Sequence, residues 1–234
     1  MRSGFLATLV LLAACGGSGG GLVLTDLPQF DAANFPGGPV DNPYFPLPVG
    51  RILTYNADTE DGFEVNTVEV TSDTKVILGV TCVVVHDTVE LDGELVEETF
   101  DWYAQDADGN VWYMGEDSTE YEGGVPVSTA GSWEAGVGGA TAGIIMWGST
   151  PPVGTSYRQE FKEGEAEDVG TILATDAMAD VPWGTFVDCV KTADTTPLEP
   201  DVYEEKFYAP GVGPVLEVDD DDVRTELVDV QDVP

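Results

Sequence analysis

Carboxylates dominate the reactive side chains of this sequence, and the other residue types that usually carry catalysis are scarce. The chain has 44 Asp and Glu residues against 8 Lys and Arg, with one histidine and three cysteines. Paired carboxylates could perform acid–base chemistry such as glycoside hydrolysis. Because acids this numerous meet in any fold, a hydrolase that uses carboxylates or a carboxylate-bound metal is only an alternative hypothesis.

His86 is the sole imidazole that could activate a serine or cysteine nucleophile. Cys82 precedes it by four positions in a Val-rich segment expected to be a strand. Side chains at that spacing share a face but lie about 13 Å apart. The spacing therefore argues against a direct pair of Cys82 with His86, and one histidine is too few for most zinc sites.

Two alternatives stay open for Cys82 and Cys189, which both lie in strand-like segments. A disulfide between distant strands would suit an oxidising compartment. Two buried free thiols would be equally compatible with the sequence. The sequence does not set the distance between the two residues, so it cannot decide between them.

The few cations are more informative than the many acids. Arg158 lies in a segment that alternates with aromatics and shares a face with Glu160, and Lys206 lies among Glu, Tyr and Phe residues. We expect ion pairs that are at least half-buried inside a β cavity. The functional interpretation makes these residues the polar anchors of a ligand pocket, with Trp102 and Trp133 as its aromatic lining.

The segment 106–110, Asp-Ala-Asp-Gly-Asn, begins like a calcium-binding loop. Its glycine stands at the fourth position of the loop, and the twelfth residue, Asp117, is not the glutamate that an EF-hand requires. The pattern therefore predicts a β-turn. It leaves room for weak surface cations such as calcium, and we expect no other cofactor.

Alternating residues and turn signals run along the chain from Arg51 onward. The Val- and Thr-rich segment 81–91 is followed by Asp92-Gly93, a hairpin turn signal, and by a return strand over 94–105. No stretch shows a strong helical period. These patterns predict an all-β fold, an antiparallel curved meander that forms a partly closed barrel or a sandwich, with little helix.

The return strand has two distinct faces. One face carries mostly apolar side chains, namely Val96, Phe100, Trp102 and Ala104, with Glu98 among them. The other face carries Glu97, Thr99 and Asp101.

The N-terminus begins with a basic residue, Arg2, continues with an apolar run over 5–12 and ends in small residues before Cys15. This pattern is typical of a secretory signal, and the run is shorter than the ~20 residues of a membrane-spanning helix. Leu12-Ala13-Ala14-Cys15 resembles the bacterial lipobox. The resemblance implies that residues 1–14 are removed and that lipid on Cys15 anchors the chain to a membrane.

Three regions follow from these patterns. Residues 1–14 form the signal peptide, 15–43 a lipidated tether rich in Gly and Pro, and 44–234 one acidic β domain. The location is the extracytoplasmic cell envelope. In a cell with two membranes the outer one is favoured, because Gly16 follows the cysteine in place of an aspartate that retains lipoproteins in the inner membrane.

The formal net charge of −36 has three interpretations: adaptation to concentrated salt, binding of multivalent cations, or contact with a basic partner. The acids are spread along the chain, which favours salt adaptation and predicts lower stability as ionic strength falls. Binding to nucleic acid or to anionic lipid through a basic face is excluded.

Three segments, 42–47 (NPYFPL), 157–160 (YRQE) and 208–213 (YAPGVG), resemble an uncharacterised family of secreted bacterial β proteins. The resemblance implies one exported domain and transfers no site. The leading hypothesis is therefore a non-catalytic, lipid-anchored envelope protein that binds an apolar or amphipathic ligand, or a protein partner. Besides the hydrolase, the remaining alternative is a structural envelope component adapted to high salt.

Overall fold

The computed structural model describes residues 23–233. The expected signal peptide 1–14, Cys15 and the glycine run after it lie outside the described residues. One short 3-10 helix, η1 (Ala32–Asn34), precedes the strands. The strands are β1 (Arg51–Thr59), β2 (Gly62–Ile77), β3 (Val80–Leu91), β4 (Glu94–Gln105), β5 (Val111–Glu122), β6 (Val125–Ser128), β7 (Trp133–Glu134), β8 (Thr141–Met146), β9 (Ser156–Arg158), β10 (Glu160–Phe161), β11 (Val169–Val181), β12 (Gly184–Thr196), β13 (Glu199–Ala209), β14 (Gly213–Val218) and β15 (Arg224–Asp232).

The strands form one antiparallel sheet in the order β10-β8-β5-β4-β3-β2-β1-β15-β14-β13-β12-β11-β9, with β6 and β7 paired to β5. The all-β curved meander expected from the sequence is confirmed, and the sheet is not closed into a barrel. No helix within residues 23–233 is long and apolar enough to cross a membrane.

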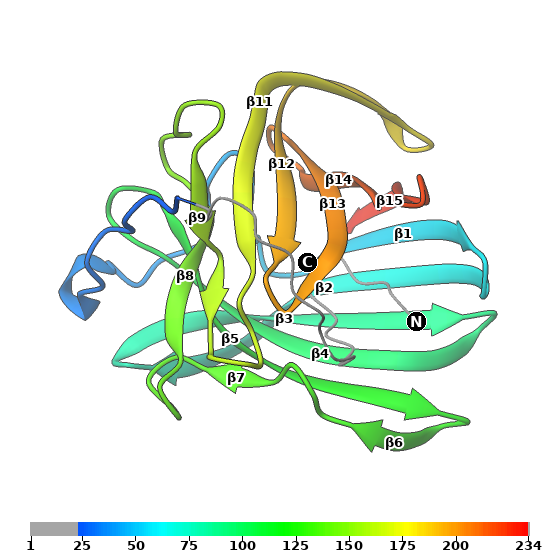
Figure 1. Cartoon of the computed structure of the whole chain (residues 1–234), viewed down its shortest axis with the longest axis horizontal. Coiled ribbons are helices and arrows are strands. Elements are labelled where there is room, and N and C mark those ends of the chain that lie inside the picture. The colour runs from blue at the N-terminus through cyan, green and yellow to red at the C-terminus, as the bar shows by residue number, and fades with distance from the viewer. Residues whose placement is uncertain (1–22, 234) are drawn as a thin grey trace.

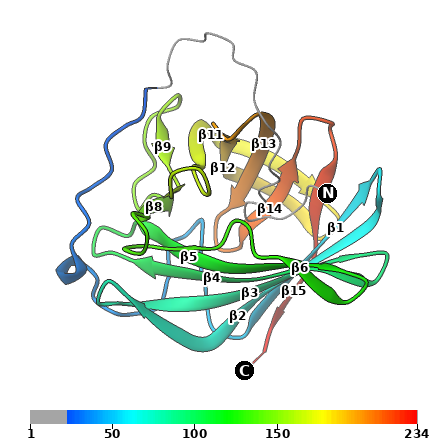
Figure 2. The same ribbon diagram turned by 60° about the horizontal axis from the view of Figure 1, so that its bottom comes forward.

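The sheet bends over on itself in two halves (Figures 1 and 2). Strands β1–β5 run across the lower part of Figure 1, and β9 and β11–β13 stand above them. The halves join where β1 pairs with β15, with Arg51 opposite Asp232. The concave faces of the two halves therefore enclose the interior of the domain.

The two ends of the strand order lie next to each other in the sequence. β9 pairs with β11 and β10 pairs with β8, and Gln159 alone separates β9 from β10. The chain at this crossing passes directly over Gly143 of β8, where a Cβ atom would stand 2.4 Å from the carbonyl carbon of Gln159. The sequence needs glycine there because no side chain fits.

Replacing Gly143 by alanine is therefore expected to destabilise the fold by about 1–3 kcal/mol, the usual cost of an added methyl group in a packed region. Chemical denaturation measures this loss. The matched control is Gly38→Ala, because a Cβ at Gly38 meets no atom within 4 Å. Equal stability of the two variants would contradict the crossing geometry.

The described part of the expected tether, residues 23–43, makes several contacts with the domain. The amide of Thr25 donates to the carbonyl of Ser156, and Val40 is fully buried. Phe30 and Phe35 make edge contacts with the ring of Trp112. The apolar side chains among the prolines therefore hold this segment on the sheet.

Two of the segments quoted for the family resemblance meet in the core. Phe45 lies between the rings of Tyr103 and Tyr208, and the amide of Gly211 donates to the carbonyl of Pro43. The Asn42 side chain donates to the carbonyls of Gly109 and Trp147 at 2.9 and 3.0 Å. The segment 42–47 thus joins the entry of the domain to its C-terminal half.

Cys82 on β3 and Cys189 on β12 are free thiols, both fully buried. The disulfide that the sequence left open is therefore not formed, and the alternative of two packed thiols holds. Burial raises the pKa of Cys82 to about 12 and also raises the pKa of Cys189. Neither thiol is primed as a nucleophile.

The polar face of β4 points into the interior and the face with Phe100 points outward. Glu97, Thr99 and Asp101 are buried, whereas Val96 is half-exposed and Phe100 exposed. The same inward face on β2 and β3 carries further buried polar groups: Glu64, Asn66 and Asp87. An interior lined by carboxylates is unusual, and it leads directly to the functional site.

Candidate functional site: an acidic cleft

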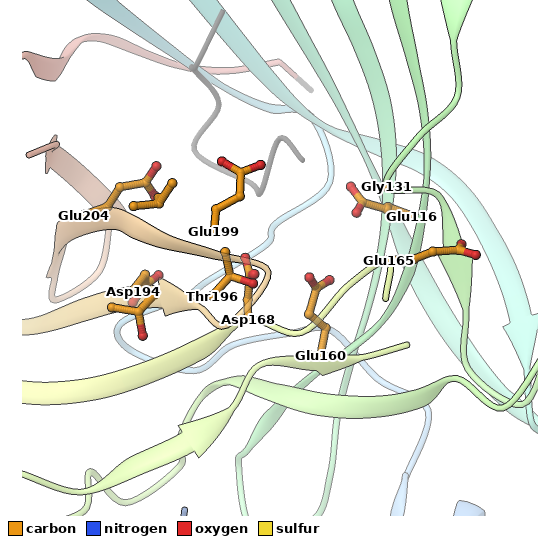
Figure 3. Close-up of a pocket in the computed structure, with 11 residues that line it drawn as sticks. Glu116, Gly131, Glu160, Glu165, Asp168, Asp194, Thr196, Glu199 and Glu204 are labelled. Atoms are coloured by element: carbon orange, nitrogen blue, oxygen red, sulfur yellow. The ribbon is translucent and has the colours of Figure 1, made fainter. Parts of the chain in front are cut away.

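A narrow cleft opens between the two halves of the sheet, and its walls are dominated by carboxylates. Its lining residues are Glu116, Gly131, Glu160, Glu165, Asp168, Asp194, Thr195, Thr196, Glu199, Val202 and Glu204. Figure 3 shows the carboxylates of Glu116 and Glu160 directed toward the space between the walls, whereas Glu165 points away from it. β5 and β10 supply one side, and β12, β13 and the turn between them supply the other.

Glu160 is the most buried acid of the cleft, with 2% of its surface exposed. Its carboxylate points into the cleft (Figure 3), and its Oε2 atom accepts no hydrogen bond. Burial, reinforced by the charges of Asp168 and Asp101, raises its pKa well above the ordinary value. The nearby Trp133 indole and Lys206 offset this rise only in part.

Glu116 enters the cleft from β5 and is the direct cross-strand partner of Asp101 on β4. Two like charges opposite each other destabilise a sheet, so one proton between them is favourable. Burial, together with the charge of Glu160, raises the pKa of Glu116 well above its usual value. Burial also raises the pKa of Asp101 to about 7, against the effect of the Tyr113 hydroxyl, which donates to Asp101 Oδ1 at 2.6 Å.

Lys206 on β13 supplies the positive charge on the opposite wall. Its Nζ lies 3.4 Å from Asp194 Oδ2, 3.4 Å from Glu204 Oε2 and 3.6 Å from Glu217 Oε2. Burial alone would lower its pKa, but the three carboxylates outweigh burial and raise it. Lys206 therefore stays charged and stabilises the acids around it.

Asp168 lies between the Lys206 group and Glu160. Burial raises its pKa to about 7, although Lys206 acts in the opposite direction. Burial likewise raises the pKa of Glu204. Near neutral pH the cleft is therefore able to exchange protons with solvent.

Within residues 23–233, no group of three or more His, Cys, Asp or Glu side chains is arranged to hold a metal ion. The 106–110 segment forms the expected turn. Asp106 accepts hydrogen bonds from the amides of Asp108 and Asn110 and from the side chains of Asn110 and Trp112. Both of its oxygens therefore serve the turn itself.

The structure brings three of the sequence-predicted site residues together. Glu160 lines the cleft, Lys206 contacts the lining acids Asp194 and Glu204, and Trp133 lies beside Glu160. Trp133 is nevertheless buried, with 3% of its surface exposed. Its indole therefore supports the cleft from behind and does not form an apolar lining.

Trp102 and Arg158 do not belong to the cleft. Trp102 packs in the core with 6% of its surface exposed, and the Lys75 ammonium lies 3.1 Å from its ring centre. Arg158 stacks at 4.0 Å on the ring of Phe161. A continuous strand would have placed Arg158 and Glu160 on the same face. The strand instead breaks at Gln159, and this break separates the two side chains.

The sequence did not single out most of the cleft acids, namely Glu116, Asp168, Asp194, Glu199 and Glu204. Each is one carboxylate among 44, and their strands meet only when the sheet bends. The one usable signal was the position of Lys206 beside Glu204 in a strand-like segment, because a scarce cation attracts acids. His86, by contrast, stacks on Phe100 and contacts Glu98 at 2.9 Å on the outer face, away from the cleft.

No protein-family model matches this chain, and no curated protein matches it. Among solved structures, the chain is similar to a presumed exported protein with a YmcC-like fold from Bacteroides fragilis, at 16% identity and a TM-score of 0.41. It is also similar to a presumed lipoprotein from Parabacteroides distasonis, at 13% identity and a TM-score of 0.42. Each comparison covers 80% of this chain and 98% of the other. At this level of similarity neither carries an argument about function.

Proposed function

We propose that this protein is an exported, lipid-anchored cell-envelope protein whose acidic cleft binds a positively charged ligand. Cys15 in its lipobox-like setting supports the anchor. Glu160 carries the ligand assignment, because its buried carboxylate points into the cleft and its Oε2 atom, itself shielded from solvent, has only the Trp133 indole near it as a donor. A buried carboxylate is costly unless a cation or a proton neutralises it.

The cleft supports a cation better than the apolar ligand expected from the sequence. Seven of its eleven lining residues are acids and one, Val202, is aliphatic. The two tryptophans expected to line an apolar pocket are packed in the interior. An amphipathic ligand remains compatible only if its charged end is positive.

The binding assignment predicts a saturable change in tryptophan fluorescence when small organic cations are added, because Trp133 lies next to Glu160. Glu160→Gln should abolish the change. Asp117→Asn is the matched control, since Asp117 is exposed and follows Glu116 on β5, so its side chain lies on the opposite face of the strand. Equal responses of both variants would mean that the signal reports surface charge and not the cleft.

The anchor assignment predicts that the wild-type protein, expressed in a bacterium, partitions into detergent and carries the mass of its acyl chains on Cys15. Cys15→Ser should move the protein to the aqueous phase, because the lipid has no attachment point. Recovery of wild-type protein without acyl mass, cut elsewhere in the N-terminal segment, would contradict the lipobox assignment.

A second candidate function is glycoside hydrolysis by Glu116 and Glu160. Both acids face the cleft, and the charge of Glu160 raises the pKa of Glu116, so Glu116 would be the protonated general acid and Glu160 would have to ionise to act as the base or nucleophile. This function would give a bell-shaped pH profile of glycan cleavage that Glu116→Gln and Glu160→Gln each abolish. Cation binding without cleavage of any glycan would contradict the hydrolase and support the binding function.

A further inference from the structure

The spacing of the cleft acids narrows the ligand class. The carboxylates are distributed along both walls (Figure 3) and, within the described residues, do not converge as metal ligands. A single ion would neutralise only some of them. A ligand with several positive charges along a chain could reach acids on both walls.

The kind of cation follows from the lining. No aromatic ring from residues 23–233 lines the cleft, so these residues form no cage of the kind that recognises quaternary ammonium groups. A guanidinium group prefers a planar, two-pronged contact with one carboxylate. An ammonium group donates three hydrogen bonds in different directions, which suits carboxylates that approach from several strands.

Lys206 shows how this protein itself satisfies such acids. One buried primary ammonium serves Asp194, Glu204 and Glu217 at 3.4–3.6 Å. On the opposite wall Lys162 pairs with Glu165. No ion pair among residues 23–233 reaches the two buried acids of that wall, Glu116 and Glu160, and Glu160 Oε2 has only the Trp133 indole near it as a donor. An incoming ammonium group would complete that wall in the way Lys206 completes its own.

Resting on the proposed function, we infer that the cleft binds a ligand with two or more primary ammonium groups on alkyl chains, with one ammonium at Glu160 and Glu116. Free polyamines and lysine-rich peptide segments both carry this chemistry. The methylene links between the charges would pass Val202 and the Thr195–Thr196 pair, the least charged part of the lining.

Binding should release protons. The groups that face Glu160 are Glu116 on β5, Asp101 on β4, Asp168 before β11, Lys206 on β13 and the indole of Trp133 on β7. Three of these neighbours are acids, so the carboxyl groups of this wall retain protons when no ligand is bound in the cleft. An ammonium ligand replaces those protons, and affinity should rise with pH until the wall is fully ionised.

Titration calorimetry of the purified protein with spermidine, trilysine and propylamine tests the inference, in two buffers of different ionisation enthalpy at pH 6.5. We expect spermidine or trilysine to bind at least about tenfold more tightly than propylamine, since each additional ammonium group adds charge-assisted hydrogen bonds. Proton release should accompany binding. Tighter binding of spermidine would identify free polyamines as the source, and tighter binding of trilysine would identify peptide lysines.

Glu160→Gln should weaken binding about tenfold or more and reduce proton release, and Asp117→Asn, with the same change in net charge, should leave both unchanged. Glu199→Gln, at the β12–β13 turn, provides a second cleft variant outside the core if Glu160→Gln does not fold. Preferential binding of argininamide or tetramethylammonium, abolished by these cleft variants, would overturn the ammonium assignment and keep the cationic cleft. Binding of no cation, or equal weakening by Asp117→Asn, would overturn both.

Discussion

Replacing Lys206 by methionine is expected to lower the free energy of unfolding by about 3–5 kcal/mol at pH 8, the usual cost of removing one partner of a buried ion pair. Methionine keeps most of the length of the side chain and removes the charge shared by Asp194, Glu204 and Glu217. Burial raises the pKa of Glu204 and of Glu217. As the pH falls toward 5, a larger share of these acids should be protonated, and the loss should shrink. Urea denaturation at both pH values measures the difference.

Lys191 on the neighbouring strand is the matched control for Lys206. Its ammonium lies 2.6 Å from Glu205, and both side chains are partly exposed to solvent. Such a pair contributes at most about 1 kcal/mol, so Lys191→Met should have a small effect at either pH. A Lys206→Met loss no larger than that of Lys191→Met would show that the acids around Lys206 are already neutral.

Asp101→Asn is expected to stabilise the protein at pH 8 and to flatten its dependence on pH. The pKa of Asp101 is about 7 in the folded state and about 3.9 in an unfolded chain. The folded state therefore binds the extra proton, and wild-type stability falls as pH rises from about 4 through about 7, by roughly 4 kcal/mol for this group. Asparagine resembles the protonated acid and accepts from Tyr113, so its advantage should appear only at the high-pH end.

Tyr113→Phe should change the same profile in the opposite direction. The Tyr113 hydroxyl donates to Asp101 at 2.6 Å and lowers its pKa. Without that donor the pKa of Asp101 rises further, so the decline in stability should extend to higher pH. Denaturation curves at pH 4, 6, 8 and 9 distinguish the two variants, and parallel shifts of both profiles would contradict the role of Asp101.

Local elements of the fold were predictable because neighbouring residues determine them. The turn at Asp92-Gly93 and the return strand over 94–105 agree with β4 (Glu94–Gln105). The inward direction of Glu97 and Asp101 was not predictable, because a burial preference for apolar side chains would turn that face toward solvent. The polar face of β4 is internal because the second half of the sheet folds over it.

The same distinction applies to the site. Lys206 was identifiable because cations are scarce, and Glu160 because it lies two residues from Arg158. The expected partnership of Glu160 with Arg158 failed at the break in the strand at Gln159. The remaining cleft acids belong to separate strands, and their proximity depends on how β5, β10, β12 and β13 are brought together across the bend.

The pairing of β1 with β15 has a consequence for how the molecule folds. The contact between Arg51 and Asp232 spans 181 positions of the chain, and contacts of such long sequence separation form slowly. Until β15 is in place, β1 is a sheet edge whose amide and carbonyl groups can pair with another molecule. Chains that have not yet placed their last strand are therefore the population most exposed to aggregation, and the speed of that final pairing sets how long the exposure lasts.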